Sequence, residues 1–190
     1  GIALDTVGGF GHRLLVTGPV GRDKTQVSAV DCRGAVTRIG TVRARLEGGM
    51  SVAPHGFGVF GGQLVAASEV SGSIYAVSPT GKLSVVAASG VPRGSDIGVE
   101  SVGFVPATGA SAAYLADRGT PRSRQPHPGT DSLLRISAPA FPAEPGDLLV
   151  ATEGAATVVL VRCAPTCTTT VAATGPAAAH GEGHLLIRPS

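Results

Sequence analysis

The sequence has no Trp and only two Tyr and five Phe among its 190 residues, so it does not favour a large aromatic recognition surface. Charged residues make up 15% and the formal net charge is +2, which is too small to attract a phosphate backbone. We therefore expect no nucleic-acid partner. No stretch approaches the ~20 consecutive apolar residues of a membrane-spanning helix, so the sequence predicts no membrane span.

Cysteine is also scarce, with three residues. Cys163 and Cys167 lie between two apolar runs, and a hairpin there would bring their sulfurs together, so we expect a disulfide, with two free thiols as the alternative. A zinc site is not favoured, because the spacing is C-x3-C and there is no second pair. A disulfide indicates an oxidising compartment, and a start at Gly1 without Met or an apolar leader is compatible with removal of a signal peptide. We therefore expect a secreted or extracytoplasmic protein.

Small aliphatic residues and turn formers dominate what is present. Hydrophobic residues make up 43%, and 28 Gly and 14 Pro are spread along the whole chain. The apolar runs are short, are separated by Gly, Pro, Asp or Ser, and show no sustained period of 3.6 residues. The pattern predicts an all-β chain with frequent turns, and the length suits a single domain, 1–190, with its own core.

The chain also contains an internal repeat of about 50 residues, a period typical of stacked sheets. Segment 1–39 aligns with segment 50–86, and the punctuation by glycine is nearly the same in both. The matched runs are 2–4 with 52–54, 14–16 with 64–66, 27–30 with 74–77, and 34–36 with 81–83. Each segment therefore predicts one antiparallel meander of four strands.

Looser strand patterns follow in the second half of the chain. They predict strands near 102–106, 112–116 and 133–137, then near 148–152, 157–161, 168–173 and 185–188. No first strand is visible for the last set, and the Pro-rich segment 138–145 is expected to be an irregular link. The approximate units are 1–46, 47–97, 98–143 and 144–190. A four-stranded unit buries too little alone, so we expect radial stacking into a β-propeller of about four visible blades; a β-sandwich is the alternative.

A glutamate recurs in phase with the predicted units. Glu47, Glu100 and Glu182 each open an apolar run that ends at a proline six or seven residues later. The first strand of each blade lines the channel of a propeller, so the three carboxylates are expected to converge and to need neutralisation by protons or by a hard cation such as Ca²⁺. The alternative is that each glutamate only accepts backbone N–H bonds at a junction between blades.

Histidine supplies further candidates. In an extended chain His180, Glu182 and His184 share a face and could hold a metal ion, but the two glycines between them favour a solvated turn. His184 or His55 could serve as a catalytic base, but the sequence has no Gly-x-Ser-x-Gly elbow for a serine nucleophile.

Gly181-Glu182-Gly183 matches three positions of a Gly-Glu-Gly-Pro turn, with His184 in place of Pro. Together with the blade pattern, this resembles the six-bladed propellers that include the gluconolactonase and senescence-marker family and the esterase-like or phytase-like propellers. The resemblance implies that the chain is part of a larger six-bladed ring and that Glu182 binds a metal ion. The Asn and Asp ligands of that family have no equivalent here, which leaves its activity in doubt for this chain.

Two functions from different classes remain. The first is a binding or scaffold propeller without chemistry, whose loops, such as 117–131 and 13–24, contact an unknown protein or small molecule. The second is a metal-dependent hydrolase of a lactone or ester, in which a central Ca²⁺-type ion polarises the carbonyl or activates water. The sequence favours the first, because it needs fewer assumptions.

Overall fold

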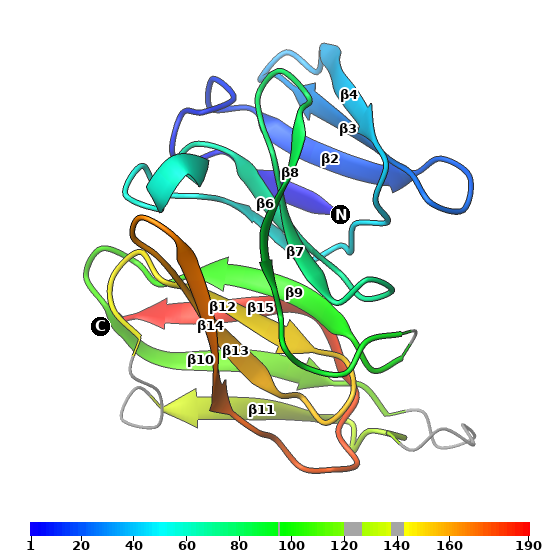
Figure 1. Ribbon diagram of the computed structural model, residues 1–190, viewed down its shortest axis with the longest axis vertical. Coiled ribbons are helices and arrows are strands. Elements are labelled where there is room, and N and C mark those ends of the chain that lie inside the picture. The colour runs from blue at the N-terminus through cyan, green and yellow to red at the C-terminus, as the bar shows by residue number, and fades with distance from the viewer. Residues whose placement is uncertain (95, 120–126, 138–142) are drawn as a thin grey trace.

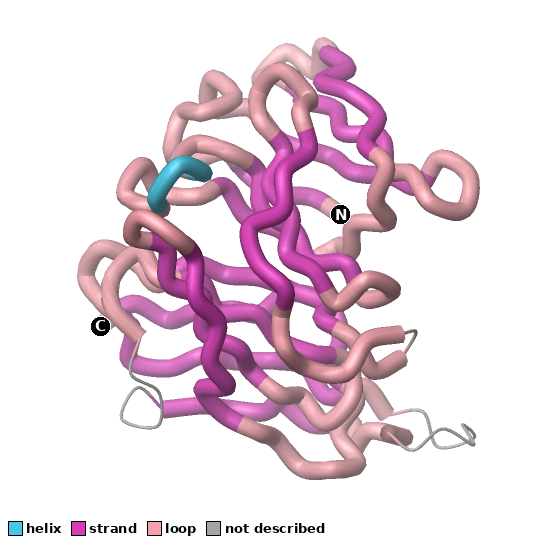
Figure 2. Tube along the Cα trace, viewed as in Figure 1, coloured by secondary structure: helices cyan, strands magenta, loops and turns pink. Residues whose placement is uncertain are grey.

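The computed structural model describes residues 1–94, 96–119, 127–137 and 143–190. Antiparallel β-strands make up nearly all of its regular structure, and a single 3-10 turn, η1 (Gly58–Phe60), interrupts them (Figure 2). The prediction of an all-β chain is therefore confirmed. The strands form four sheets, not the two of a sandwich.

The first two sheets are four-stranded meanders, as the repeat predicts. The first sheet has the order β1-β2-β3-β4, with β1 (Ile2–Leu4), β2 (Leu14–Pro19), β3 (Thr25–Val30) and β4 (Val36–Val42). The second sheet has the order β5-β6-β7-β8, with β5 (Met50–Val52), β6 (Leu64–Ser68), β7 (Ser73–Val77) and β8 (Leu83–Ala88).

The other two sheets group their strands differently from the expected units 98–143 and 144–190. The third sheet has the order β9-β12-β13-β14, with β9 (Val99–Phe104), β12 (Leu148–Thr152), β13 (Val158–Cys163) and β14 (Cys167–Ala173). The fourth sheet has the order β15-β10-β11, with β10 (Ala110–Asp117), β11 (Ser132–Ser137) and β15 (Gly181–Pro189). In the sequence, the set of strands that begins near residue 148 shows no first strand. In the structure that strand is β9, and the β10–β11 hairpin separates it along the chain from its partner β12.

The sheets stack in series, with one hydrophobic core between each neighbouring pair. The cores join the first sheet to the second, the second to the third, and the third to the fourth. Figure 1 shows the first sheet at one end of the long axis and β11 at the other. Among the described residues no strand of the first sheet pairs with the fourth, so the stack is open and no closed ring is seen.

One strand of each sheet lies nearest the neighbouring sheets. Strand β1 contacts β5, β5 contacts β9, and β9 contacts β15. A parallel bridge links Gly49, just before β5, to Ser101 of β9, and the backbone N of Val102 donates to Gly49 O at 2.9 Å. A Cβ on Gly49 would lie 2.2 Å from the Cβ of Ser101, so only glycine allows these strands to approach this closely. We call β1, β5, β9 and β15 the first strands of their sheets, because each lies at the sheet edge nearest its neighbours, although β15 comes last along the chain. The first strands of successive sheets therefore begin close together.

The structure brings the two cysteines of the predicted disulfide together. The sulfurs of Cys163 and Cys167 lie at disulfide distance, 1.99 Å, across the β13–β14 hairpin, while Cys32 is free and exposed. The described part of the chain includes no helix with the length and apolar character needed to cross a membrane. Residues 120–126 of the expected partner loop 117–131 and residues 138–142 of the expected link lie outside the described residues.

Candidate functional site

Six carboxylates gather at one end of the stack. Because neighbouring strands are antiparallel, the start of a sheet's first strand lies beside the end of its second strand. The backbone N of Glu47 thus donates to Ala67 O at 2.9 Å, and the backbone N of Glu153 donates to Gly98 O at 2.8 Å. The residues at these strand ends are Glu47, Glu69, Glu100, Asp117, Glu153 and Glu182.

The tightest group at this end consists of Glu153, His180 and Glu182. His180 Nε2 lies 2.8 Å from Glu153 Oε1 and 3.4 Å from Glu182 Oε1. One donor atom from each of the three side chains lies within 4.8 Å of the other two. The His180 and Glu153 side chains are buried and that of Glu182 is 31% exposed, so solvent reaches the group on the side of Glu182.

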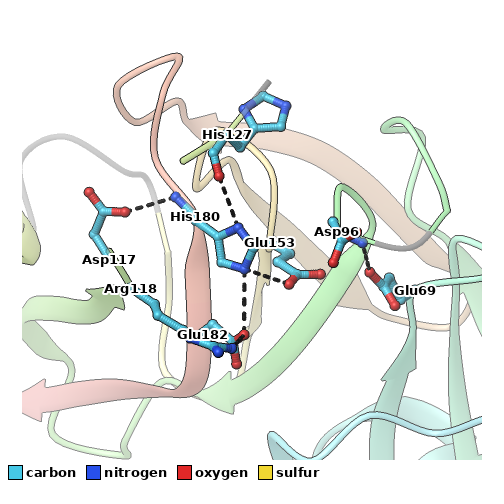
Figure 3. A network of polar contacts seen from close by, with 8 residues as sticks. All are labelled: Glu69, Asp96, Asp117, Arg118, His127, Glu153, His180 and Glu182. Atoms are coloured by element: carbon cyan, nitrogen blue, oxygen red, sulfur yellow. Dashed lines mark hydrogen bonds and ion pairs between the residues drawn. The ribbon is translucent and has the colours of Figure 1, made fainter. Parts of the chain in front are cut away.

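The backbone fixes the orientation of the His180 ring. Its Nδ1 lies 3.0 Å from the carbonyl oxygen of His127, and since a carbonyl can only accept, Nδ1 carries a proton. Nε2 is then the atom directed at Glu153 and Glu182 (Figure 3). The 2.8 Å contact between Nε2 and Glu153 Oε1 needs a proton between the two atoms, and a cation that displaces this proton would meet the Nε2 lone pair. A histidine held in this way, with the second nitrogen on a carbonyl, is the usual arrangement of a metal-ligating imidazole.

Two further charged residues support the group. Asp117 Oδ1 accepts from the backbone N of His180 at 2.8 Å, and its other oxygen accepts from the backbone N of Thr130 at 3.0 Å. Arg118 Nη1 donates to Glu182 Oε1 at 2.6 Å. Asp117 therefore holds the start of β15 in place, while Arg118 partly balances the negative charge of Glu182.

The electrostatics show that the carboxylates are close enough to repel one another. Burial, and then the charges of Glu47, Glu182 and Glu69, raise the pKa of Glu100 to about 7. Burial also raises the pKa of Glu153 to about 9, with help from a hydrogen bond to Glu69 and from the charges of neighbouring glutamates. A bound cation would neutralise these carboxylates in place of the protons that the raised pKa values of Glu100 and Glu153 favour.

Glu47 has one buried carboxylate oxygen, Oε1, that accepts no hydrogen bond from the described residues. Burial and then the charge of Glu69 raise the pKa of its carboxyl group. Its nearest cation is Arg45, whose Nε lies 3.9 Å from Glu47 Oε1, which is too far for a hydrogen bond.

The three glutamates predicted from sequence lie at the same end, but they are not the tightest group. The charges of both Glu47 and Glu182 act on Glu100, so the three carboxylates are neighbours. Only Glu182 belongs to the described group whose donor atoms lie within 4.8 Å of one another. Its two partners are Glu153 and His180.

The structure separates His184 from His180 and Glu182. Gly183 has φ 77°, and the pairing between β10 and β15 shifts between Tyr114 opposite Leu186 and Ala116 opposite Glu182. His184 is exposed and does not belong to the described group whose donor atoms lie within 4.8 Å of one another. The other candidate base, His55, is also exposed and follows β5, whereas Glu47 precedes it.

Sequence reasoning missed Glu69 and Glu153, although a signal for both exists. Glu69 directly follows Ala67-Ser68 at the end of β6, and Glu153 directly follows Ala151-Thr152 at the end of β12. The second strand of two sheets therefore carries its own recurring carboxylate, next to the one that opens the first strand.

The donor set decides which cation fits. Ca²⁺ takes six to eight oxygen ligands, whereas imidazole together with carboxylate suits Zn²⁺ and related transition metals. Two carboxylates and one imidazole nitrogen therefore fit a Zn²⁺-type ion better than the Ca²⁺ expected from sequence. Three protein ligands would leave a coordination position for water or for a ligand.

A scan against protein-family models finds no match for this chain, and neither does a search of curated proteins.

Proposed function

We propose that this chain is an extracytoplasmic binding protein of the β-propeller type that holds a divalent cation through Glu153, His180 and Glu182. The observation that carries the proposal is the orientation of His180. Its Nδ1 is bound to a carbonyl oxygen, so Nε2 is directed at two carboxylates within 3.4 Å. A buried imidazole fixed in this way between carboxylates is a preformed ligand set.

Three observations support the propeller part of the proposal. The sheets are antiparallel, they stack face to face with a core between each pair, and their first strands begin close together at one end. Blades around an axis share these properties. An extracytoplasmic location is supported by the disulfide-distance pair Cys163 and Cys167.

The cation would stabilise the carboxylate end of the stack. Glu153 follows a strand of the third sheet, while His180 directly precedes β15 of the fourth sheet and Glu182 lies at its start. An ion held by all three would link the two sheets and would neutralise charges that otherwise repel. The loops beyond this end would then be held in a fixed geometry for a partner, which is the role of a binding module.

A metal-dependent hydrolase of a lactone or ester is the second candidate. The observation that favours it is the small number of protein ligands, because three donor atoms leave room for a water molecule or a substrate carbonyl on the exposed side of Glu182. The cation would polarise that carbonyl or lower the pKa of the bound water.

Thermal melting after chelation tests the cation site. Zn²⁺ at about one hundred times its dissociation constant is expected to stabilise the chain by about 2.7 kcal/mol and to raise the melting temperature by about 5 to 10 °C. Glu153→Gln and Glu182→Gln should lose most of this shift, and the exposed Glu144→Gln should keep it. An unchanged melting temperature with Zn²⁺ and with Ca²⁺ would refute the site.

Two further arms separate the alternatives. A Ca²⁺ shift that is lost in Glu100→Gln but kept in Glu153→Gln would favour the three-carboxylate site formed by Glu47, Glu100 and Glu182. Hydrolysis of a nitrophenyl ester and of a simple lactone, measured before and after chelation, tests the enzyme candidate. Turnover that depends on the metal and is lost in Glu153→Gln supports a hydrolase, and absence of turnover in a metal-binding chain supports the binding module.

A further inference from the structure

The two end sheets of the stack each have one face without a neighbouring sheet. Each inner sheet packs one face on the preceding sheet and the other face on the following sheet. We call these the leading face and the trailing face. The first sheet uses only its trailing face, and the fourth sheet uses only its leading face. Two faces of the stack, the leading face of the first sheet and the trailing face of the fourth, therefore remain open in the described structure.

The leading face of the first sheet matches, position by position, a face that is buried in the second sheet. Register places Ile2 opposite Val16 in the first sheet and Met50 opposite Ala66 in the second. The first-strand alignment made from sequence is therefore wrong by two residues, but a shift of two keeps each side chain on the same face. The matched pairs are Ile2 with Met50, Leu4 with Val52, Leu14 with Leu64, Val16 with Ala66, Val30 with Val77, and Val36 with Leu83.

The members of each pair differ in burial and not in chemistry. In the second sheet all six residues pack in the core against the first sheet, and Met50 and Val52 are only 4% and 5% exposed. In the first sheet their counterparts Ile2, Leu4 and Val36 are 51%, 60% and 68% exposed. The first sheet thus carries the apolar set that the second sheet uses to pack on a preceding sheet. We therefore expect another sheet of the same kind to cover the leading face of the first sheet.

The fourth sheet offers an open face of the required type. Its leading face, with Leu115 and Leu134, packs in the core against the third sheet. Its trailing face carries Leu133 and Leu186, which are 63% and 62% exposed. The register places Tyr114 opposite Leu186 on one side and opposite Arg135 on the other, so an arginine accompanies the exposed apolar side chains of this face. Large exposed apolar side chains on one sheet face are typical of an interaction surface.

We propose that a second copy of this chain packs the trailing face of its fourth sheet on the leading face of the first sheet. Inside the chain every contact between sheets joins a trailing face to a leading face. The proposed contact repeats this order, so it extends an interface that the chain already uses three times. Such a contact is heterologous, joining different surfaces of the two copies, and it closes into a ring or continues as a chain of copies.

Light scattering coupled to size-exclusion chromatography tests the contact on the disulfide-intact protein. We expect a mass of at least twice 18.8 kDa. Leu4→Arg on the leading face and Leu133→Arg on the trailing face should each raise the dissociation constant of the assembly at least tenfold. Val59→Arg, which alters a 75% exposed residue of η1 away from both faces, should not. A monomeric wild-type chain would overturn the proposal.

Mixing the two face variants distinguishes this contact from a symmetric one. Leu4→Arg keeps an intact trailing face and Leu133→Arg keeps an intact leading face, so the mixture should form a dimer that neither variant forms alone. A Leu133→Arg variant that still dimerises by itself would instead indicate a contact between two leading faces and would overturn the proposal. Circular dichroism and melting curves for each variant establish that it is folded before its mass is interpreted.

Discussion

His180 Nε2 lies 2.8 Å from Glu153 Oε1, although the two residues belong to different sheets. Glu153 follows β12 of the third sheet, and His180 precedes β15 of the fourth. The backbone holds this contact from both sides, because Gly181 N donates to Glu153 O and His180 N donates to Asp117 Oδ1. The junction between two sheets is therefore also the place where the candidate ligands meet.

The stability of the metal-free chain should fall as pH rises. Glu47, Glu100 and Glu153 all have a raised pKa in the folded state, so the folded chain holds protons that the unfolded chain has already released. The contribution is fully present below the ordinary glutamate pKa, and it is lost as pH rises through about 7 for Glu100 and about 9 for Glu153. Melting in a chelator from about pH 5 to about pH 9 measures this trend.

Glu100→Gln is the matched variant for this pH series. It removes one titrating group and keeps the side-chain volume, so the melting temperature should vary less with pH between about 5 and about 7. Bound Zn²⁺ should reverse the trend, since a cation competes with protons and binds more tightly as pH rises. A metal-free chain whose stability increases over this whole pH range would contradict the assignment of raised pKa values.

Gly49→Ala should destabilise the chain by about 2 to 4 kcal/mol, because the new methyl group would overlap Ser101 of the neighbouring sheet. Gly56→Ala is the control, since a Cβ there meets no atom within 4 Å. Urea denaturation of both variants gives the comparison. Equal stability of the two would mean that β5 and β9 do not approach each other as described.

Sequence predicted the strands better than it predicted their partners. Alternation and turn residues identified the short apolar runs, and the repeat correctly indicated two equivalent four-stranded sheets at the start of the chain. The pairing of β9 with β12 could not be predicted, because a hairpin of the fourth sheet separates them along the chain. Local patterns carry no information about a partner that lies beyond an inserted hairpin.

The candidate site was predicted in part for a similar reason. Glu182 and His180 were both selected from sequence, and the structure brings them within 3.4 Å of each other. Glu153 was missed because only the pairing of β9 with β12 places it beside the start of β15. His184, which the sequence places with them, is exposed and is not part of the group of Glu153, His180 and Glu182.

Asp5 should be one of the most destabilising carboxylates to replace. It is 1% exposed, and its two oxygens accept four backbone N–H bonds at 2.7 to 3.1 Å. Burial alone would raise the pKa of the Asp5 carboxyl, but these bonds outweigh it and lower the pKa. Its contribution is therefore present above the ordinary aspartate pKa and is lost as pH falls through the lower folded value. Asp5→Ala should cost about 2 to 4 kcal/mol in urea denaturation at neutral pH.

Asp31→Ala provides the comparison for Asp5. Asp31 is partly exposed and accepts two backbone N–H bonds in the turn between β3 and β4. Because solvent can replace these bonds, its loss should cost about 1 kcal/mol or less. A similar cost for both variants would contradict the role assigned to burial at Asp5.

Thiol titration should detect one reactive cysteine in the native chain and three after denaturation with a reductant. Cys32 is free and exposed, whereas Cys163 and Cys167 lie at disulfide distance. The pair closes a loop of only a few residues, so the double variant Cys163→Ala, Cys167→Ala should lose only about 2 kcal/mol of stability. Three reactive thiols before reduction would contradict the disulfide, and with it the support for an oxidising compartment.

The most direct test of the cation site is an anomalous-difference map from crystals grown with Zn²⁺. The account predicts one peak between the three side chains, about 2.0 to 2.2 Å from His180 Nε2 and from an oxygen of each of Glu153 and Glu182. A map without a peak there, or with zinc bound only at exposed histidines such as His55 and His184, would contradict it.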